Sequence, residues 1–125
     1  MPQFGVLVYS PSPADPMALS SERLDEIARY PALAKELGGK VLGGSYFARQ
    51  RGFAFEPSTD AATIVGDEVR SGPLVDSELV PAAFYVISAP DMDTAVRVAR
   101  AHPTTRDGGV EVRRLFVPDD ESPTE

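Results

Sequence analysis

Two side chains in the sequence have the chemistry of an acid–base pair, the carboxylate of Asp76 and the imidazole of His102. Asp76 follows a turn formed by Ser71, Gly72 and Pro73, and loops on a rigid scaffold are where binding and catalytic groups concentrate. His102 is the only histidine, so any imidazole that transfers a proton near neutral pH must be this one. Asp76 and His102 are therefore the candidate catalytic residues.

Each of the two also has a structural interpretation. A loop acid after a Gly-Pro turn commonly accepts hydrogen bonds from nearby backbone N–H groups and so shapes the turn. A histidine in the last turn of a helix, directly before Pro103, can interact with the final carbonyl groups of that helix. Nothing in the sequence pairs His102 with Asp76, so both interpretations stay open.

Further polar side chains are candidates for ligand binding. Tyr9 and Tyr30 carry hydroxyls on mostly apolar segments, where a tyrosine is usually a core aromatic with its hydroxyl at the rim. Arg113 and Arg114 alternate along the last predicted strand, so one of them must face inward or toward a partner, where it needs an acid or an anionic ligand. The expected ligand-binding residues are Tyr9, Tyr30, Ser71, Gly72, Pro73 and Arg113.

Several kinds of site are not expected. The chain has no cysteine, which rules out a disulfide framework and a thiolate metal site. One histidine and scattered carboxylates show no recognisable metal-ligand spacing. Gly38-Gly39-Lys40 lacks the upstream glycine and the following hydroxyl residue of a phosphate-binding loop. We expect neither a metal nor a cofactor.

The formal net charge is −7, which argues against a nucleic-acid partner because that affinity depends on neutralising phosphates. No segment has the length and apolarity of a signal peptide or a membrane span, so no membrane partner and a cytoplasmic location are expected. Residues 1–117 are predicted to form one domain. Residues 118–125 (PDDESPTE) are predicted to form an acidic flexible tail.

These residues must be positioned by a β-α-β unit, a hairpin and a second β-α-β unit. One helix is predicted to begin at Ser20 or Ser21 and to end at Gly38-Gly39, and a second to be capped by Asp91. A hairpin is predicted from Ala62–Val65 and Glu68–Arg70. The predicted strands are Phe4–Tyr9, Lys40–Ala48, Ala82–Ser88 and Val110–Val117.

The apolar spacing in each helix predicts which side chains meet the core. In the first helix these are Leu24, Ile27, Leu33 and Leu37. In the second helix they are Met92, Ala95, Val96 and Ala99.

The order of elements predicts an α+β, ferredoxin-like βαββαβ fold with a hairpin insertion. Its four-stranded antiparallel sheet would have the first and third strands in the middle, and these two segments are apolar on both faces. Both helices pack on one face in this topology, which leaves an apolar face of the kind that monomers avoid. We therefore expect a homodimer that joins the open sheet faces of two copies.

The same motifs, in this order, resemble the YCII-related family, including its branch named for a DGPF motif. The resemblance spans about Phe4 to Val117. It rests on five segments: VLVY, ALSSER with Tyr30 and Leu37-Gly38, SGPLVD, AFYVISAPDMDTA and HPTTRDGGVEVR.

The resemblance implies a ferredoxin-like fold that pairs into a dimeric α/β-barrel arrangement. It also implies, for some members, a lyase or dehalogenase activity on lactones or hydroxylated aromatics with a His–Asp acid–base pair. Asp76 matches the acid of the family's G-P-x-x-D loop. The segment 20–37, where the family histidine is expected, contains no histidine, and Ser71 and Leu74 replace the DGPF aspartate and phenylalanine.

Our leading hypothesis is a small dimeric domain that binds a small, partly apolar molecule between sheet and loops. Asp76, Tyr9 and Arg113 are the residues most expected to line that site. One alternative is a cofactor-independent enzyme, a lyase, isomerase or dehalogenase-like protein, in which Asp76 is the base and His102 or a tyrosine the acid. Another is a structural or regulatory interaction module.

Overall fold

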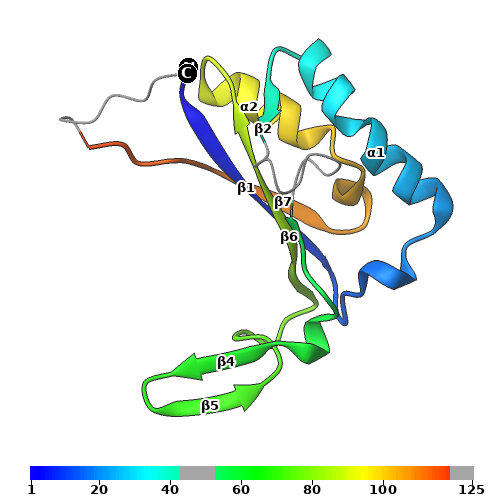
Figure 1. The fold of residues 1–125 in the computed structure, drawn as a ribbon, viewed down its shortest axis with the longest axis vertical. Helices are drawn as coiled ribbons and strands as arrows, with labels where there is room; N and C mark the ends of the chain where they lie inside the picture. Colours follow the sequence, from blue (N-terminus) through cyan, green and yellow to red (C-terminus); the bar gives the residue numbers. More distant parts are fainter. Residues whose placement is uncertain (43–52, 119–125) are drawn as a thin grey trace.

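The structure, a computed structural model that describes residues 1–42 and 53–118, has its α-helices on one side of a sheet (Figure 1). The helices are α1 (Ser21–Glu36) and α2 (Met92–Arg100). Both were predicted, and the fold class is confirmed as α+β.

The sheet is antiparallel and consistent with a ferredoxin-like fold. Its central strands are β1 (Gln3–Pro11) and β6 (Leu79–Ser88). β2 (Lys40–Leu42) flanks β6, and β7 (Gly109–Arg114) flanks β1, which gives the order β2-β6-β1-β7. The predicted first and third strands are therefore in the middle, as expected.

The predicted helix caps are confirmed. Ser20 Oγ accepts a hydrogen bond from the Arg23 backbone N–H at 3.0 Å, and Asp91 Oδ1 accepts one from the Thr94 backbone N–H at 2.8 Å. Gly38 follows α1 with φ of 98°, a left-handed conformation that glycine adopts without a steric penalty. These local contacts fix where each helix begins and where α1 ends.

The register of the central strands decides which side chains face the helices. Val6 pairs with Tyr85 and Phe4 pairs with Ile87, and all four side chains are buried. The helices complete this core with small or aromatic side chains, namely Tyr30, Ala34, Ala95, Val98 and Ala99.

The predicted helix faces are partly wrong. Leu24 and Leu33 of α1 are exposed, and so are Met92 and Val96 of α2. Leu24 lies along a cavity described below, so the first turns of α1 stand over a space rather than over packed core. In α2 the buried stripe is centred on Val98, because this side of the helix lies against the sheet.

Some element bounds also differ from the prediction. β6 begins at Leu79 rather than Ala82, and β7 ends at Arg114, so residues 115–117 lie beyond the last strand. Only Lys40–Leu42 of the second predicted strand is described as β2. The remainder of that strand and residues 119–125 of the predicted tail lie outside the described residues.

The structure also contains short elements that were not predicted from the sequence. One is a two-residue strand, β3, which pairs with β6. The others are short 3₁₀ segments. In chain order these elements are η1 (Pro16–Ala18), β3 (Phe53–Ala54), η3 (Ser58–Asp60) and η4 (Pro103–Arg106).

The predicted hairpin is confirmed as β4 (Ala62–Val65) and β5 (Glu68–Ser71). It projects from one end of the sheet, on the side away from the helices (Figure 1). On that same side the strand register places Leu7 of β1 and Phe84 of β6, which pair with each other. We call this side of the sheet the open face, because α1 and α2 both lie on the other side.

We expect Gly108→Ala to destabilise the fold. A Cβ at this position would overlap the backbone oxygen of Tyr9, and such overpacking typically costs about 1–3 kcal/mol. The adjacent Gly109 is a matched control, because within the described part of the chain no heavy atom beyond its two sequence neighbours lies within 4 Å of its Cβ position. Urea unfolding should show a lower free energy of unfolding for Gly108→Ala and little change for Gly109→Ala. Equal stabilities would contradict this close approach.

Candidate functional site

A cavity of about 580 Å³ lies between the helix side of the sheet, α1 and the connection from β1 to α1. Val8 and Ala83 line it from the sheet, Ile27 from α1, and Phe55 from the segment after β3. Its walls are therefore largely apolar. Such a volume and lining are typical of a small-molecule site.

At one end of this cavity two tyrosines form a buried hydrogen-bonded chain. The hydroxyls of Tyr30 and Tyr85 are 2.7 Å apart, and the Tyr30 hydroxyl also donates to the carbonyl oxygen of Val98 at 2.7 Å. A carbonyl can only accept, so the order of donation is Tyr85 to Tyr30 to Val98. Neither hydroxyl proton is left for a ligand.

Burial keeps both phenols neutral. It raises the pKa of Tyr30 to about 12, partly offset by the hydrogen bond with Tyr85. It raises the pKa of Tyr85 still further, and the neighbouring Tyr30 adds to this effect. The pair is therefore a structural and hydrogen-bonding group, and neither tyrosine is a source of phenolate near neutral pH.

His102 packs against both tyrosines. Its ring lies edge-on to Tyr30, with centroids 4.9 Å apart, and stacks on Tyr85 at 5.6 Å. It was predicted in the last turn of the second helix; instead it follows the C-cap of α2 and serves as N-cap of η4. Its Nδ1 accepts a hydrogen bond from the Thr104 backbone N–H at 3.2 Å.

The imidazole of His102 is buried and neutral. Its side chain is 8% exposed, and burial lowers its pKa to about 4, with a smaller effect from the positive charge of Arg23. Because Nδ1 is an acceptor, the proton of the neutral ring belongs to Nε2.

The Nε2–H of His102 is a donor whose partner is not found among the described residues. No group in the described part of the chain accepts a hydrogen bond from it. Every fully buried polar side-chain atom of the described residues does have a partner. His102 and Tyr30 border both the large cavity and a smaller one of about 340 Å³.

A bidentate ion pair forms another part of the cavity wall. Arg23 Nη1 and Nη2 donate to the two carboxylate oxygens of Asp107 at 3.3 and 3.2 Å. Arg106 at the end of η4 forms a second ion pair, through Nη2 and a single carboxylate oxygen of Glu26 in α1, and this hydrogen bond lowers the pKa of the Glu26 carboxyl. Two arginine–carboxylate pairs thus join α1 to the segment that carries His102.

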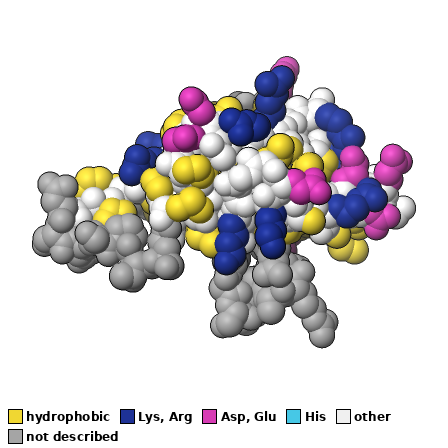
Figure 2. Space-filling view, turned by 90° about the horizontal axis from the view of Figure 1, so that it is seen from above, with side chains coloured by type: hydrophobic (Ala, Val, Ile, Leu, Met, Phe, Trp, Pro, Cys, Tyr) yellow, Lys and Arg dark blue, Asp and Glu magenta, His cyan; other side chains and the backbone are white. Residues whose placement is uncertain are grey.

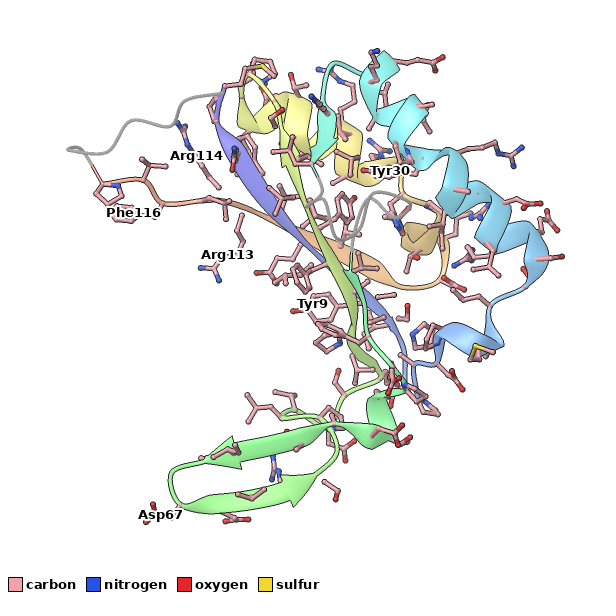
Figure 3. The ribbon with its side chains drawn as sticks, in the orientation of Figure 1. Tyr9, Tyr30, Asp67, Arg113, Arg114 and Phe116 are labelled. Carbon is pink, nitrogen blue, oxygen red and sulfur yellow. The ribbon has the colours of Figure 1, made fainter. Side chains whose placement is uncertain are left out.

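The predicted site residues fall in three separate places. His102 and Tyr30 line the cavity. Tyr9 and Arg113 belong to the open face, and Figure 3 shows Arg113 directed away from Tyr30 and the helices.

The turn residues and Asp76 lie at the base of the hairpin. Gly72 accepts a hydrogen bond there from the Thr63 hydroxyl at 2.7 Å and has φ of 95°. Asp76 is exposed and has no hydrogen-bond or ion-pair partner among the residues that the structure describes. Its carboxylate therefore neither lines the cavity nor bonds to the loop backbone.

The sequence did not identify Arg23 and Asp107 as site residues. They are 84 positions apart in the chain, and no local pattern links a charge in a first helical turn to an acid before a glycine pair. Tyr85 had the appearance of an ordinary strand aromatic. Only the packing of α1 and η4 on β6 brings these side chains to the same cavity.

The described residues contain no group of three His, Cys, Asp or Glu side chains that could hold a metal ion. None of the described helices is long and apolar enough to cross a bilayer. Seen from above, basic side chains are scattered among acidic ones and form no single basic patch on the visible face (Figure 2).

Comparison with known proteins adds one match. A family model described as YCII-related domain matches residues 15–118. A search of curated proteins finds no match.

We expect His102 to titrate far below an ordinary histidine, with an NMR midpoint near the pKa of about 4. The unfolded chain then binds the proton more readily, so stability falls from pH 6.5 toward pH 4, by about 1.4 kcal/mol per pH unit within that window. His102→Gln should flatten this dependence in urea unfolding. A midpoint near 6.5 would contradict the buried, neutral imidazole.

Proposed function

The chain belongs to the YCII-related domain family, and on this premise we propose that it binds a small, uncharged, partly apolar molecule in the cavity beside His102. The observation that carries this proposal is the Nε2–H of His102, a donor on a buried ring that has no acceptor among the described residues. A ligand with one hydrogen-bond acceptor would satisfy it.

The lining supports a ligand of this kind. Apolar walls favour burial of a hydrocarbon or aromatic body, at about 25 cal/mol for each Å² removed from water. Tyr30 and Tyr85 use their hydroxyl protons on each other and on Val98, so the imidazole is the donor that remains on this wall. A carbonyl, ether or similar acceptor at Nε2 would therefore orient the ligand.

The charges around the cavity support an uncharged ligand. Among the described residues, three carboxylates border it, those of Asp15, Glu56 and Asp107, against one guanidinium, that of Arg23. Arg23 is already paired with Asp107. An anionic ligand would have to displace that pair and would meet the remaining carboxylates, which is unfavourable.

Binding is better supported than proton-transfer catalysis. An acid–base pair would need Asp76 near His102, but Asp76 lies at the base of the hairpin and does not line the cavity. The neutral ring of His102, which borders the cavity, carries its proton on Nε2, and its Nδ1 lone pair is occupied by the Thr104 backbone N–H. This suits a hydrogen-bond donor rather than a general base.

We also propose that two copies join through the open face, in the dimeric α/β-barrel arrangement that the family resemblance implies. Leu7, Phe84 and Val86 stand on this face and are half-buried within one chain. Covering them with a second copy would remove apolar surface from water. Assignment to the DGPF branch and a cytoplasmic location stay predictions.

We expect acetophenone to bind more tightly than ethylbenzene, by about fivefold to tenfold, because its carbonyl can accept the hydrogen bond from His102. Benzoate should bind most weakly. Ligand-observed NMR titration at pH 7.5 measures all three. In the His102→Phe variant, acetophenone should no longer bind more tightly than ethylbenzene, because the imidazole N–H that donates to its carbonyl is absent.

Two variants serve as controls for this experiment. Tyr85→Phe removes a hydroxyl that does not offer its proton to the cavity, and Asp76→Ala removes a carboxylate outside it. Both should keep the preference for acetophenone. Equal binding of acetophenone and ethylbenzene to the unmodified protein would contradict the role of His102. If benzoate bound more tightly than acetophenone, the proposal that the ligand is uncharged would be wrong. If none of the three probes bound, the proposal that the cavity is a ligand site would be wrong.

We expect Val86→Glu to dissociate the proposed dimer, since it places a charge in the middle of the open face. Val96→Glu is the matched control, because Val96 is 47% exposed on α2, on the other side of the sheet. Sedimentation equilibrium should give the mass of one chain for Val86→Glu and of two chains for Val96→Glu. The same mass for both variants would count against this interface.

A further inference from the structure

The β4–β5 hairpin carries apolar side chains that the rest of the described chain does not cover. Ile64 and Val69 pair across the two strands and are 68% and 67% exposed. Val65 near the turn is also exposed. An isolated two-stranded hairpin is only marginally stable in water, so this one needs a surface to pack against.

A second exposed apolar segment leaves the sheet at another point. It comprises Leu115, Phe116 and Val117, directly after β7, and Phe116 is 87% exposed. Figure 3 shows Phe116 and the hairpin residue Asp67 on the same side of the sheet, well apart from each other. The hairpin and this segment therefore border the open face from its two ends.

The hairpin end and the β7 end of the open face differ in charge. Asp67 and Glu68 are at the tip of the hairpin, where Glu68 pairs with Val65. Arg113 and Arg114 are the last residues of β7, and the register places Arg113, which pairs with Gly5, on the open face and Arg114, which pairs with the core residue Phe4, on the helix side. The Arg113 side chain is 75% exposed, and its contact with Glu111 is long, at 3.9 Å. The hairpin thus presents acidic and apolar side chains, whereas the end of β7 with residues 115–117 presents basic and apolar ones. Within the described residues of one chain these two regions do not touch each other.

We propose that the hairpin of each copy packs on the β7 end and segment 115–117 of a second copy of this chain. This contact rests on the proposed homodimer and specifies how its two sheets are oriented. Consider a two-fold axis that lies between the two facing sheets and runs perpendicular to the strands. It places the hairpin end of one sheet opposite the β7 end of the other sheet. It brings Asp67 and Glu68 toward Arg113 of the other copy and the hairpin's apolar side chains toward Phe116.

Charge argues against the alternative axis. A two-fold axis along the strands would bring hairpin against hairpin, with Asp67 and Glu68 of both copies together. It would also bring the arginines of the two β7 ends together. Like charges at a contact are repulsive, whereas complementary charges favour one docking orientation over another. The axis across the strands is therefore the one that pairs opposite charges at both ends.

Two charge-reversal variants test this contact. The hairpin variant combines Asp67→Lys with Glu68→Lys, and the strand variant is Arg113→Glu. Each alone places like charges at both contacts, so we expect its dimer dissociation constant to rise by about tenfold or more. An equimolar mixture can form a heterodimer with opposite charges at both contacts. Sedimentation equilibrium should show that the mixture recovers dimer.

A third variant, Asp25→Lys with Glu36→Lys, makes the same change in net charge as the hairpin variant on exposed positions of α1. It should leave the dissociation constant unchanged. Circular dichroism of each variant establishes that it is folded.

Two other results would overturn the proposal in distinguishable ways. If Val86→Glu dissociates the dimer but the charge variants behave like the unmodified chain, or if their mixture does not recover, the hairpin contact is wrong and the dimer stands. If the unmodified chain sediments as a monomer, the dimer and the hairpin contact are both wrong.

Discussion

The structure depends on the need to satisfy polar groups that the fold buries between sheet and helices. Tyr85 comes from the central strand β6, Tyr30 from the middle of α1, and the carbonyl of Val98 from α2. An unsatisfied buried hydroxyl costs about 1–3 kcal/mol, so these elements must keep the spacing that lets each group meet its partner. Such a requirement is directional, unlike the apolar contacts around it, and it fixes α1 and α2 relative to β6.

The same arrangement determines the character of His102. Its ring fills the space beside the two phenols, where an imidazolium would lose its hydration without gaining a carboxylate partner. The nearest charge that affects its pKa is the like charge of Arg23. A histidine held in this way is a neutral donor with a fixed direction. The cavity therefore combines non-directional apolar contacts with one oriented polar group, which is the combination that ligand sites commonly use.

The fold could be predicted because strand alternation and helix caps are local signals. Phe4, Val6 and the capping residue Asp91 specify their elements within a few positions of sequence. The helix faces were harder: Leu24 lines a cavity, and a spacing pattern cannot distinguish a packed core from an empty space. The site was predicted only as residue types. The face on which a side chain lies depends on strand register, and the pairing of Arg23 with Asp107 depends on packing between distant segments.

The two arginine–carboxylate pairs between α1 and the 3₁₀ turn after α2 have a consequence for the path of a ligand. Separating these elements would break Arg23 from Asp107 and Arg106 from Glu26 together. The opposite rim, formed by the proline-rich connection around Ala14 and by Phe55, is held by hydrogen bonds instead. The Ala14 N–H donates to Ser58 Oγ at 2.9 Å, and the Ser58 N–H donates to the Ala14 carbonyl oxygen at 2.8 Å. Both rims are therefore tied, one through ion pairs and the other through hydrogen bonds, so a ligand that enters by parting either rim must break one of these two sets of contacts.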